Sequence, residues 1–451
     1  MTEVPHAKIR KGVNFPFSPQ RFPLFYGWVI LAAGIVGTVA SVPGQTIGVG
    51  VFKESLLFTL KISEVKLSLA YMIGTATSSL ILPFAGRILD RVGARPMAVV
   101  TTIAMGISLF IFSQAGRVVE CNPFPVSDSV YAVVVMSIIY LMIRFFGQGC
   151  MTLIPRVMIG KWFNHRRGLA AGILGVFMSF GFGISPKILD VLVGKPEGSG
   201  WVITLIGLAL LIGLGVSLLS WLLYRDNPES CGLAPDGVRD PEWHKRMQEK
   251  FPDVHREFTR KEAVFTISFW AFSLGLSSMS LVLTAVTFHI ATIAENQGTT
   301  RDIVYNMFIP TAAVSVIANF SGAWLSDRIK LKWLLLVMMT CQALGMLGTM
   351  HVADFAGRLM YIIGMGISGG LFAALITVVW PRYFGRLHLG AISGLNLMMI
   401  VMGSAIGPWL FSAAQAQTGS YIQVIQFCLA IPALVFIMGL FAENPQRKWA
   451  P

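Results

Sequence analysis

Residues 86–95 read GRILDRVGAR, a short charged stretch between two long apolar runs. A partial second copy, GAWLSDR, occupies residues 322–328 and also follows an apolar run. Both copies place a glycine before an Asp-Arg pair, which is Asp90-Arg91 in the first copy and Asp327-Arg328 in the second. The repetition predicts that the chain contains two related halves.

The composition around these stretches excludes a soluble globular enzyme. Of the 451 residues, 55% are hydrophobic and 13% are charged, whereas soluble domains carry about 25% charged residues. The net charge of +13 does not indicate a nucleic-acid partner, because the 35 Lys and Arg lie almost entirely between apolar runs. We expect an all-α polytopic membrane protein whose surroundings are the lipid bilayer.

Apolar runs near the roughly 20 residues that a bilayer core requires predict the membrane helices. Twelve such runs lie near residues 24–46, 66–86, 96–115, 130–154, 168–190, 201–224, 266–292, 303–325, 333–352, 358–380, 390–414 and 420–441. They predict a tail (1–23), a six-helix half (24–224), a linker (225–263), a second six-helix half (264–442) and a second tail (443–451).

The basic residues predict the orientation. Most Lys and Arg lie in the two tails, the linker and the loops that share their side of the membrane. Because basic loops are retained in the cytoplasm, we expect both termini and the linker to be cytoplasmic. We interpret the first apolar run as a membrane helix, since it is too long for a signal peptide. Compact loops favour a bacterial inner membrane.

An internal duplication supports two parallel six-helix halves, a plan found in transporters. Small and proline residues recur at one offset, and Trp28 and Trp270 mark the start of each half. The recurring positions are Gly168, Gly172, Gly181 and Pro186, matched by Gly390, Gly394, Gly403 and Pro408.

The stretch 86–95 resembles the GxxxDRxGRR signature of the major facilitator superfamily. The resemblance implies twelve transmembrane helices in two pseudo-symmetric halves. Charges at helix ends can form a network in one conformation and break it in another, so we expect a gate there. For Arg87 and Arg95, anchoring at the headgroups is the alternative. The expected gating residues are Gly86, Asp90, Arg91, Arg95, Asp327 and Arg328.

Arg144 lies within an apolar run, where a charged side chain is costly and faces a cavity or a partner. No Asp or Glu lies deep in any predicted span, so a substrate carboxylate could supply the counter-ion for its planar guanidinium. Gln148 is one turn later on the same face. The segment also resembles the superfamily's motif in the fourth helix, whose Arg often has a structural or proton-coupling role.

Other polar residues within the runs are candidates for substrate contact or for helix packing. Gln45 follows Pro43-Gly44, and helices 1, 4 and 7 commonly line the cavity in the fold that the chain resembles. His289 could exchange protons near neutrality or form a structural hydrogen bond. Asn396 is a further candidate, although most intramembrane Asn and Gln join neighbouring helices.

Short phrases resemble the monocarboxylate and oxalate-formate group: FYGWV at 25–29, GVGVF at 48–52 and Phe288-His289. The chain departs from that group because residues 305–325 contain no Arg, Lys or Asp, whereas the group places a substrate-binding Arg there. We therefore expect a secondary carrier of a small organic anion, with a monocarboxylate favoured. Its expected substrate-binding residues are Arg144, Gln45, Gln148, His289 and Asn396.

Two alternatives remain open. The 22 Met and 31 Phe are consistent with a carrier of a larger neutral or amphipathic compound, and the fold could also serve a transport-inactive sensor or assembly component. Protons are a candidate coupling ion, and we expect a monomer. We expect no enzyme activity, cofactor or metal, because no P-loop, HExxH or metal-ligand spacing occurs.

Overall fold

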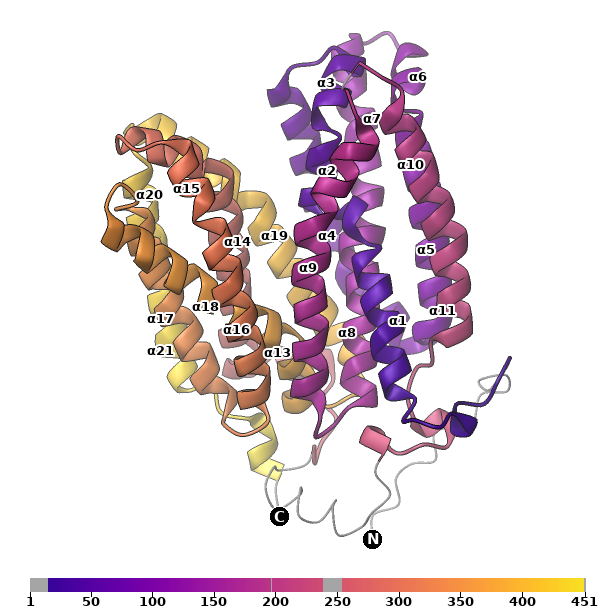
Figure 1. Ribbon diagram of the computed structural model, residues 1–451. Helices are drawn as coiled ribbons and strands as arrows, with labels where there is room; N and C mark the ends of the chain where they lie inside the picture. Colours follow the sequence, from indigo (N-terminus) through magenta and orange to yellow (C-terminus); the bar gives the residue numbers. More distant parts are fainter. Residues whose placement is uncertain (1–14, 196, 238–253, 450–451) are drawn as a thin grey trace. The chain divides into compact units, whose positions relative to one another are not determined.

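The computed structural model describes residues 15–195, 197–237 and 254–449 (Figure 1). All regular secondary structure in these ranges is helical. The middle of the predicted linker, 238–253, lies outside the described residues, as do 1–14 of the first tail and 450–451 of the second.

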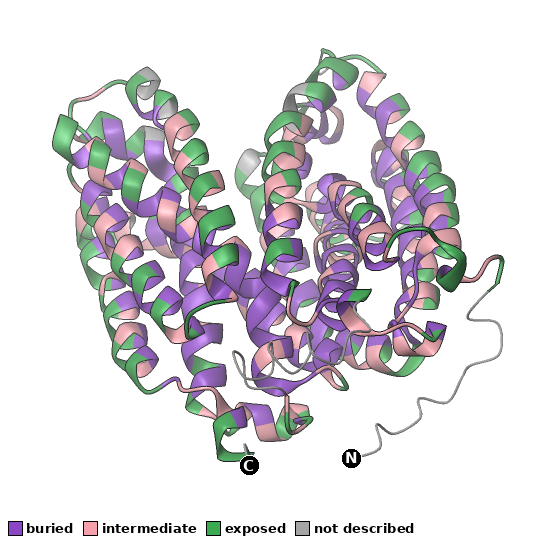
Figure 2. Cartoon of the chain, turned by 60° about the horizontal axis from the view of Figure 1, so that its bottom comes forward, coloured by how far each residue is buried: buried purple, intermediate pink, exposed green. Residues whose placement is uncertain are grey.

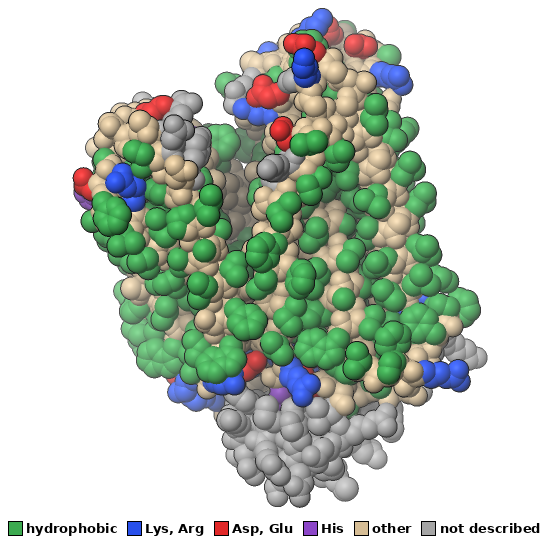
Figure 3. All heavy atoms as spheres, in the orientation of Figure 1, with side chains coloured by type: hydrophobic (Ala, Val, Ile, Leu, Met, Phe, Trp, Pro, Cys, Tyr) green, Lys and Arg blue, Asp and Glu red, His purple; other side chains and the backbone are tan. Residues whose placement is uncertain are grey.

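The helices confirm the predicted all-α membrane fold. In the described part of the chain, eleven helical stretches are long and apolar enough to cross a membrane, and Gly27–Val39 is a shorter apolar helix. Hydrophobic side chains cover the visible outer faces of the helices, whereas charged side chains gather at the helix ends (Figure 3). This distribution fits helices that face lipid, because charges are costly inside the bilayer.

The chain divides into two compact units, and the division falls inside helix α9 (Arg167–Val193). Unit 1 comprises Met1–Trp162 and Phe180–Arg239, and unit 2 comprises Phe163–Ser179 and Asp240–Pro451. The boundaries expected for the two halves, 24–224 and 264–442, stay a prediction. Within each unit, buried residues occupy the inward faces of the helices (Figure 2).

Unit 1 contains the first six predicted membrane helices, except for the start of α9. Its helices are η1 (Pro19–Arg21), α1 (Gly27–Val39), η2 (Val42–Gly44), α2 (Thr46–Val51), α3 (Lys53–Leu60), α4 (Glu64–Val92), α5 (Ala94–Ser113), α6 (Ala115–Glu120), α7 (Asp128–Ile143), η3 (Arg144–Cys150), α8 (Met151–Trp162), α10 (Gly200–Leu210), η4 (Leu211–Val216), α11 (Ser217–Leu223), η5 (Glu229–Cys231) and η6 (Pro235–Gly237).

Unit 2 contains the start of α9 and the last six predicted membrane helices. The helices that follow α9 are α13 (Arg260–Val264), α14 (Ile267–Asn296), α15 (Arg301–Asn306), α16 (Phe308–Ser326), α17 (Leu331–Thr349), α18 (Phe355–Phe384), α19 (Leu389–Thr418), α20 (Tyr421–Cys428), α21 (Ala430–Leu440) and η7 (Pro445–Trp449). The pairing of α4 with α7 in unit 1 recurs as the pairing of α16 with α18 in unit 2, which is consistent with the duplication.

The first predicted helix, 24–46, is interrupted. Helix α1 ends at Val39, a short 3-10 turn spans Val42–Gly44, and α2 begins at Thr46. Pro43 explains the break, because proline has no N–H and its ring collides with the preceding turn of a helix. Gln45 therefore lies between two helices in an extended backbone conformation (φ −86°, ψ 157°), and its predicted place inside a helix is wrong.

The charged stretch 86–95 is mostly helical, although the predicted membrane runs end at residue 86 and resume at residue 96. Helix α4 continues to Val92, and α5 begins at Ala94. The change of direction falls on Gly93 alone, whose φ of 93° is one that glycine adopts far more readily than other residues. Gly86, Asp90 and Arg91 accordingly lie on the last turns of α4.

Candidate functional site

Arg144 is a deeply buried charge in unit 1, with a relative exposure of 1%. Its Nη1 donates to the carbonyl oxygen of Gly44 at 3.1 Å and to the hydroxyl of Thr46 at 3.3 Å. The guanidinium carbon lies 5.1 Å from the centre of the Tyr71 ring, within the range of a cation–π contact. Arg144 thus connects three segments of unit 1: η3, the break after α1, and α4.

The backbone around Arg144 is a π-helical segment, η3 (Arg144–Cys150). Such segments are rare and occur frequently at functional sites. A Cβ added to Gly44 would lie 2.7 Å from Gly147 Cα, so the two glycines allow the backbones to approach closely. The π-helical segment is not predicted from the sequence, although Gly147 and Gly149 are a local signal for it.

The Arg144 site has unmet hydrogen-bonding capacity. In the described part of the chain, Arg144 Nε, Arg144 Nη2 and Gln148 Oε1 are buried without a hydrogen-bond partner. Gln45 donates to the Ser41 hydroxyl at 2.9 Å and lies between Gly44 and Thr46 in the chain. Three of the five expected substrate-binding residues, Arg144, Gln148 and Gln45, therefore belong to one region of unit 1.

His289 belongs to unit 2, where it joins α14 to α19 and α20. Its Nε2 lies 3.1 Å from the Pro408 carbonyl oxygen and 3.2 Å from the Ser412 hydroxyl, and its Nδ1 lies 3.3 Å from the Tyr421 hydroxyl. A carbonyl oxygen only accepts, so the contact with Pro408 requires a proton on Nε2. Both ring nitrogens have partners, as expected of a structural histidine.

Asn396 lies in α19, is 1% exposed, and its Nδ2 is without a hydrogen-bond partner among the described residues. The five expected substrate-binding residues are thus divided between the two units. A common binding site for all five stays a prediction.

Asp327, one of the expected gating residues, contacts two other helices of unit 2. It follows the last residue of α16, pairs with Arg382 Nη2 at 3.0 Å and accepts a hydrogen bond from the Gly168 N–H at 3.2 Å. Burial raises the pKa of the Asp327 carboxyl above its ordinary value, and the Arg382 charge opposes this rise. Arg328 stacks on Trp324, with its guanidinium carbon 3.7 Å from the ring centre.

The cation opposite Asp327 is not predicted from the sequence. Arg382 lies at the end of α18 and also donates to the Ser326 carbonyl oxygen. Nearby, Asn319 Nδ2 donates to the Gly172 carbonyl oxygen at 3.2 Å, which joins α16 to α9 a second time. The sequence signal for such a cation was the repeated Asp-Arg pair, since an acidic residue in a basic loop requires a cationic partner.

Arg95 has local partners in unit 1. Its Nε donates to the Trp221 carbonyl oxygen at 2.5 Å and its Nη2 donates to the Phe15 carbonyl oxygen at 2.7 Å. These bonds attach α5 to α11 and to the segment before α1, which suits the alternative of an anchoring residue. A gating role for Gly86, Asp90, Arg91 and Arg95 stays a prediction.

A second cluster at the same end of unit 1 was also missed. Lys161 Nζ lies 3.0 Å from Asp226 Oδ1, and the same oxygen accepts from the Ala94 N–H at 3.1 Å. Asp226 therefore joins the end of α8 to the start of α5, where a carboxylate is stabilised by the helix dipole. No group of three or more potential metal ligands occurs within the described residues.

Comparison with known proteins supports the fold and assigns the family. The sequence model of the Major Facilitator Superfamily matches residues 29–408. The chain belongs to this superfamily. Superfamily membership agrees with the helical content and with the many apolar helices, so the chain is a multi-pass membrane protein of a transporter family.

Known relatives resemble most of the chain in sequence. The multidrug resistance protein MdtL of Escherichia coli (strain K12 / DH10B) is 23% identical over 403 residues, covering 86% of this chain and 89% of the relative. MdtL of Salmonella typhimurium is 22% identical over 400 residues, covering 87% and 89%.

Three solved structures have a similar fold. The proton:xylose symporter XylE has a TM-score of 0.66 at 16% identity, with 94% of this chain and 96% of that chain covered. The E. coli fucose:proton symporter FucP has a TM-score of 0.62 at 15% identity, covering 93% and 99%. The human organic anion transporter MFSD10 (TETRAN) has a TM-score of 0.60 at 13% identity, covering 92% and 99%.

These likenesses agree with the superfamily fold and do not support the narrower subgroup. The structural likenesses lie at low identity and show the fold alone. The named relatives are multidrug resistance proteins, so the resemblance to the monocarboxylate and oxalate-formate group is not confirmed.

Proposed function

We propose that this superfamily member is a secondary carrier that moves a neutral or amphipathic organic compound across the membrane by alternating access. The named relatives favour this reading over the expected monocarboxylate, because they are multidrug resistance proteins that match 86–87% of the chain. The 22 Met and 31 Phe supply adaptable and aromatic apolar surface, which suits varied apolar substrates.

The surroundings of Arg144 carry this choice. A guanidinium that binds a substrate carboxylate needs access to the substrate, yet Arg144 is 1% exposed and contacts Gly44, Thr46 and Tyr71. Its charge is held by a carbonyl dipole, a hydroxyl and an aromatic face within unit 1. This arrangement supports a structural role for Arg144 and leaves substrate selection to apolar contacts.

A small organic anion is the second candidate substrate. It is favoured by the unpartnered Nε and Nη2 of Arg144 and by the absence of a carboxylate partner for this side chain among the described residues. A conformation that exposes these two N–H groups would present the planar fork that binds a carboxylate in a bidentate manner. Gln45, Gln148, His289 and Asn396 would then complete the site.

Uptake into proteoliposomes of purified full-length protein separates the two candidates. The panel contains a labelled lipophilic cation, a neutral amphipathic dye and a monocarboxylate, each tested with and without a pH gradient, for wild type and Arg144→Gln. We expect saturable counterflow of the amphipathic compounds in both proteins. Saturable monocarboxylate uptake that is lost in Arg144→Gln would favour the second candidate, and no counterflow of any compound would favour a transport-inactive sensor.

The gate, the orientation and the coupling ion complete the proposal. The contacts of Asp327 with Arg382 and Gly168 are formed in this conformation, and alternating access requires them to break in another. Both termini and the linker are cytoplasmic in a bacterial inner membrane, and the carrier acts as a monomer. A pH gradient that drives uptake in wild type and fails in His289→Gln would assign proton exchange to His289.

A further inference from the structure

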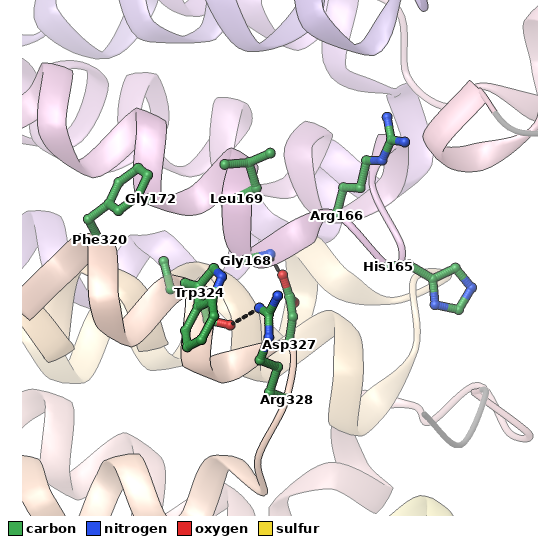
Figure 4. A pocket seen from close by; sticks show the side chains of 10 residues that line it. His165, Arg166, Gly168, Leu169, Gly172, Phe320, Trp324, Asp327 and Arg328 are labelled. Atoms are coloured by element: carbon green, nitrogen blue, oxygen red, sulfur yellow. Dashed lines mark hydrogen bonds between the residues drawn. The ribbon is translucent and has the colours of Figure 1, made fainter. Parts of the chain in front are cut away.

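A cavity of about 240 Å³ lies in unit 2 between the start of α9 and the end of α16 (Figure 4). Its α9 side is formed by His165, Arg166, Gly168, Leu169 and Gly172. Its α16 side is formed by Phe320, Ala323, Trp324, Asp327 and Arg328. Gly168 and Asp327 of its lining belong to the proposed gate, but the proposed function assigns no ligand to the space.

The charged lining of the cavity has an excess of positive charge. His165, Arg166 and Arg328 contribute the basic groups, and Asp327 is the acidic residue of the lining. The Asp327 carboxylate already pairs with Arg382 and accepts from the Gly168 N–H. A cavity with this lining attracts an anion.

The apolar lining continues from the charged end into the membrane span. Phe320, Trp324 and Arg328 are spaced by four residues and therefore lie on one face of α16 and its end. Phe320 and Trp324 are 47% and 50% exposed, and Leu169 on the α9 side is 40% exposed. From the end of α16 inward, a basic residue is followed by a tryptophan and then by an apolar residue. This is the order found at a membrane interface.

We propose that this cavity binds the phosphate group of an anionic phospholipid, with Arg166 and Arg328 at the headgroup and Phe320 and Leu169 along the acyl chain. Basic pockets between helices on the cytoplasmic side bind anionic headgroups, so the site rests on the cytoplasmic orientation proposed above. A free phosphate ester shares the charge but not the acyl chain, and the exposed apolar residues favour the lipid. The bound lipid bridges α9 and α16 and stabilises the contact between Asp327 and Gly168.

The test uses full-length protein in phosphatidylcholine nanodiscs with a photoactivatable phosphatidylglycerol. We expect cross-links to map to residues 165–172 and 317–328. Unlabelled phosphatidylglycerol competes, whereas phosphatidylcholine, glycerol phosphate and inorganic phosphate do not. Each arginine near a membrane surface is worth about fivefold in affinity for anionic lipid, so Arg166→Gln/Arg328→Gln weakens binding about 25-fold.

Two variants control for charge and for folding. Arg260→Gln/Lys261→Gln removes the same two positive charges from α13, at the same end of unit 2 but outside the cavity lining, and leaves the affinity unchanged. Arg166→Lys/Arg328→Lys keeps the charge and retains most of the binding. If the glutamine variant fails to fold, cross-link mapping and lipid competition on wild type still decide the matter.

The outcomes are separable from the proposed function. Cross-links elsewhere, equal competition by phosphatidylcholine, or full competition by glycerol phosphate would overturn the lipid site even if transport is observed. Mapped cross-links in a protein that shows no counterflow would support the lipid site and contradict the carrier assignment.

Discussion

The buried Arg144 and the partly buried Arg382 are held in opposite ways. Arg144 in unit 1 contacts a carbonyl, a hydroxyl and an aromatic ring, whereas Arg382 in unit 2 faces the Asp327 carboxylate at 3.0 Å. Removing a charge that has a buried ionic partner leaves the partner uncompensated, while removing one held by neutral groups leaves only dipoles. Removing an arginine is therefore expected to change the free energy of unfolding by different amounts in the two units.

The difference also separates two functions. An arginine paired with an acid at a helix end can break its pair when the helices move apart, as a gate requires. An arginine surrounded by neutral groups has no competing ion and keeps its N–H groups available for another acceptor. Arg382 consequently suits a conformational contact, and Arg144 suits either a structural role or an anion.

The largest expected effect is that of Arg382→Met. The Asp327 side chain is only 14% exposed, and the substitution removes its cationic partner. The loss should lower the free energy of unfolding by about 3 kcal/mol. Thermal unfolding in detergent, followed by tryptophan fluorescence, measures the loss. In the double variant Asp327→Asn/Arg382→Met most of the stability returns; a double variant as unstable as the sum of the single variants would show that the pair is not coupled.

The close approach that positions Arg144 can be broken without touching its charge. In Gly44→Ala the added Cβ meets backbone atoms of Ile143 and Gly147, and such overpacking costs about 1–3 kcal/mol. Gly50→Ala is the matched control, because nothing lies within 4 Å of its added Cβ. Equal thermal stabilities of the two variants would mean that the contact between η2 and η3 relaxes freely.

Arg144→Met should cost less than Arg382→Met. It removes the hydrogen bonds to the Gly44 carbonyl oxygen and the Thr46 hydroxyl, together worth about 2 kcal/mol, while Thr46 keeps its 2.9 Å contact with the Tyr71 hydroxyl. The same thermal measurement applies, with Arg144→Lys as the variant that retains charge. A loss as large as that of Arg382→Met would indicate an ionic partner for Arg144 and remove the contrast between the units.

Much of this contrast was accessible from the sequence. The length of the apolar runs predicts the membrane helices, because the bilayer thickness fixes how many residues must be apolar. The burial of Arg144 followed from its place within such a run, and so did its lack of a carboxylate partner, since no Asp or Glu lies deep in a predicted span.

What the sequence did not predict depends on contacts between distant segments. The π-helical turn at Arg144 and its approach to Gly44 arise where two segments about 100 residues apart meet. Arg382 is 55 residues from Asp327, and a basic residue at the end of an apolar run resembles an ordinary topology signal. Pro43 did indicate the break after α1, but its position within an otherwise apolar run obscured where α1 ends.

The smallest expected effect concerns pH. Burial raises the pKa of Asp327 and Arg382 opposes the rise, so the folded protein binds this proton more readily than the unfolded chain does. The stabilisation from protonated Asp327 is therefore complete below the ordinary carboxyl pKa of about 4 and is lost as pH rises through the raised value. The stability of wild type relative to Asp327→Asn should fall over that window and then level off.

Arg382→Met sharpens this prediction, because removing the cation takes away the influence that lowers the Asp327 pKa. The decline should then extend to higher pH, which thermal unfolding between pH 4 and pH 8 can follow in all three proteins. If the stability of wild type relative to Asp327→Asn instead rises with pH, the ion pair outweighs burial and the carboxyl pKa is depressed. The charge of Asp327 would then be the main stabilisation of Arg382. The difference between the ionic contact of Arg382 and the neutral contacts of Arg144 would be larger than the distances alone indicate.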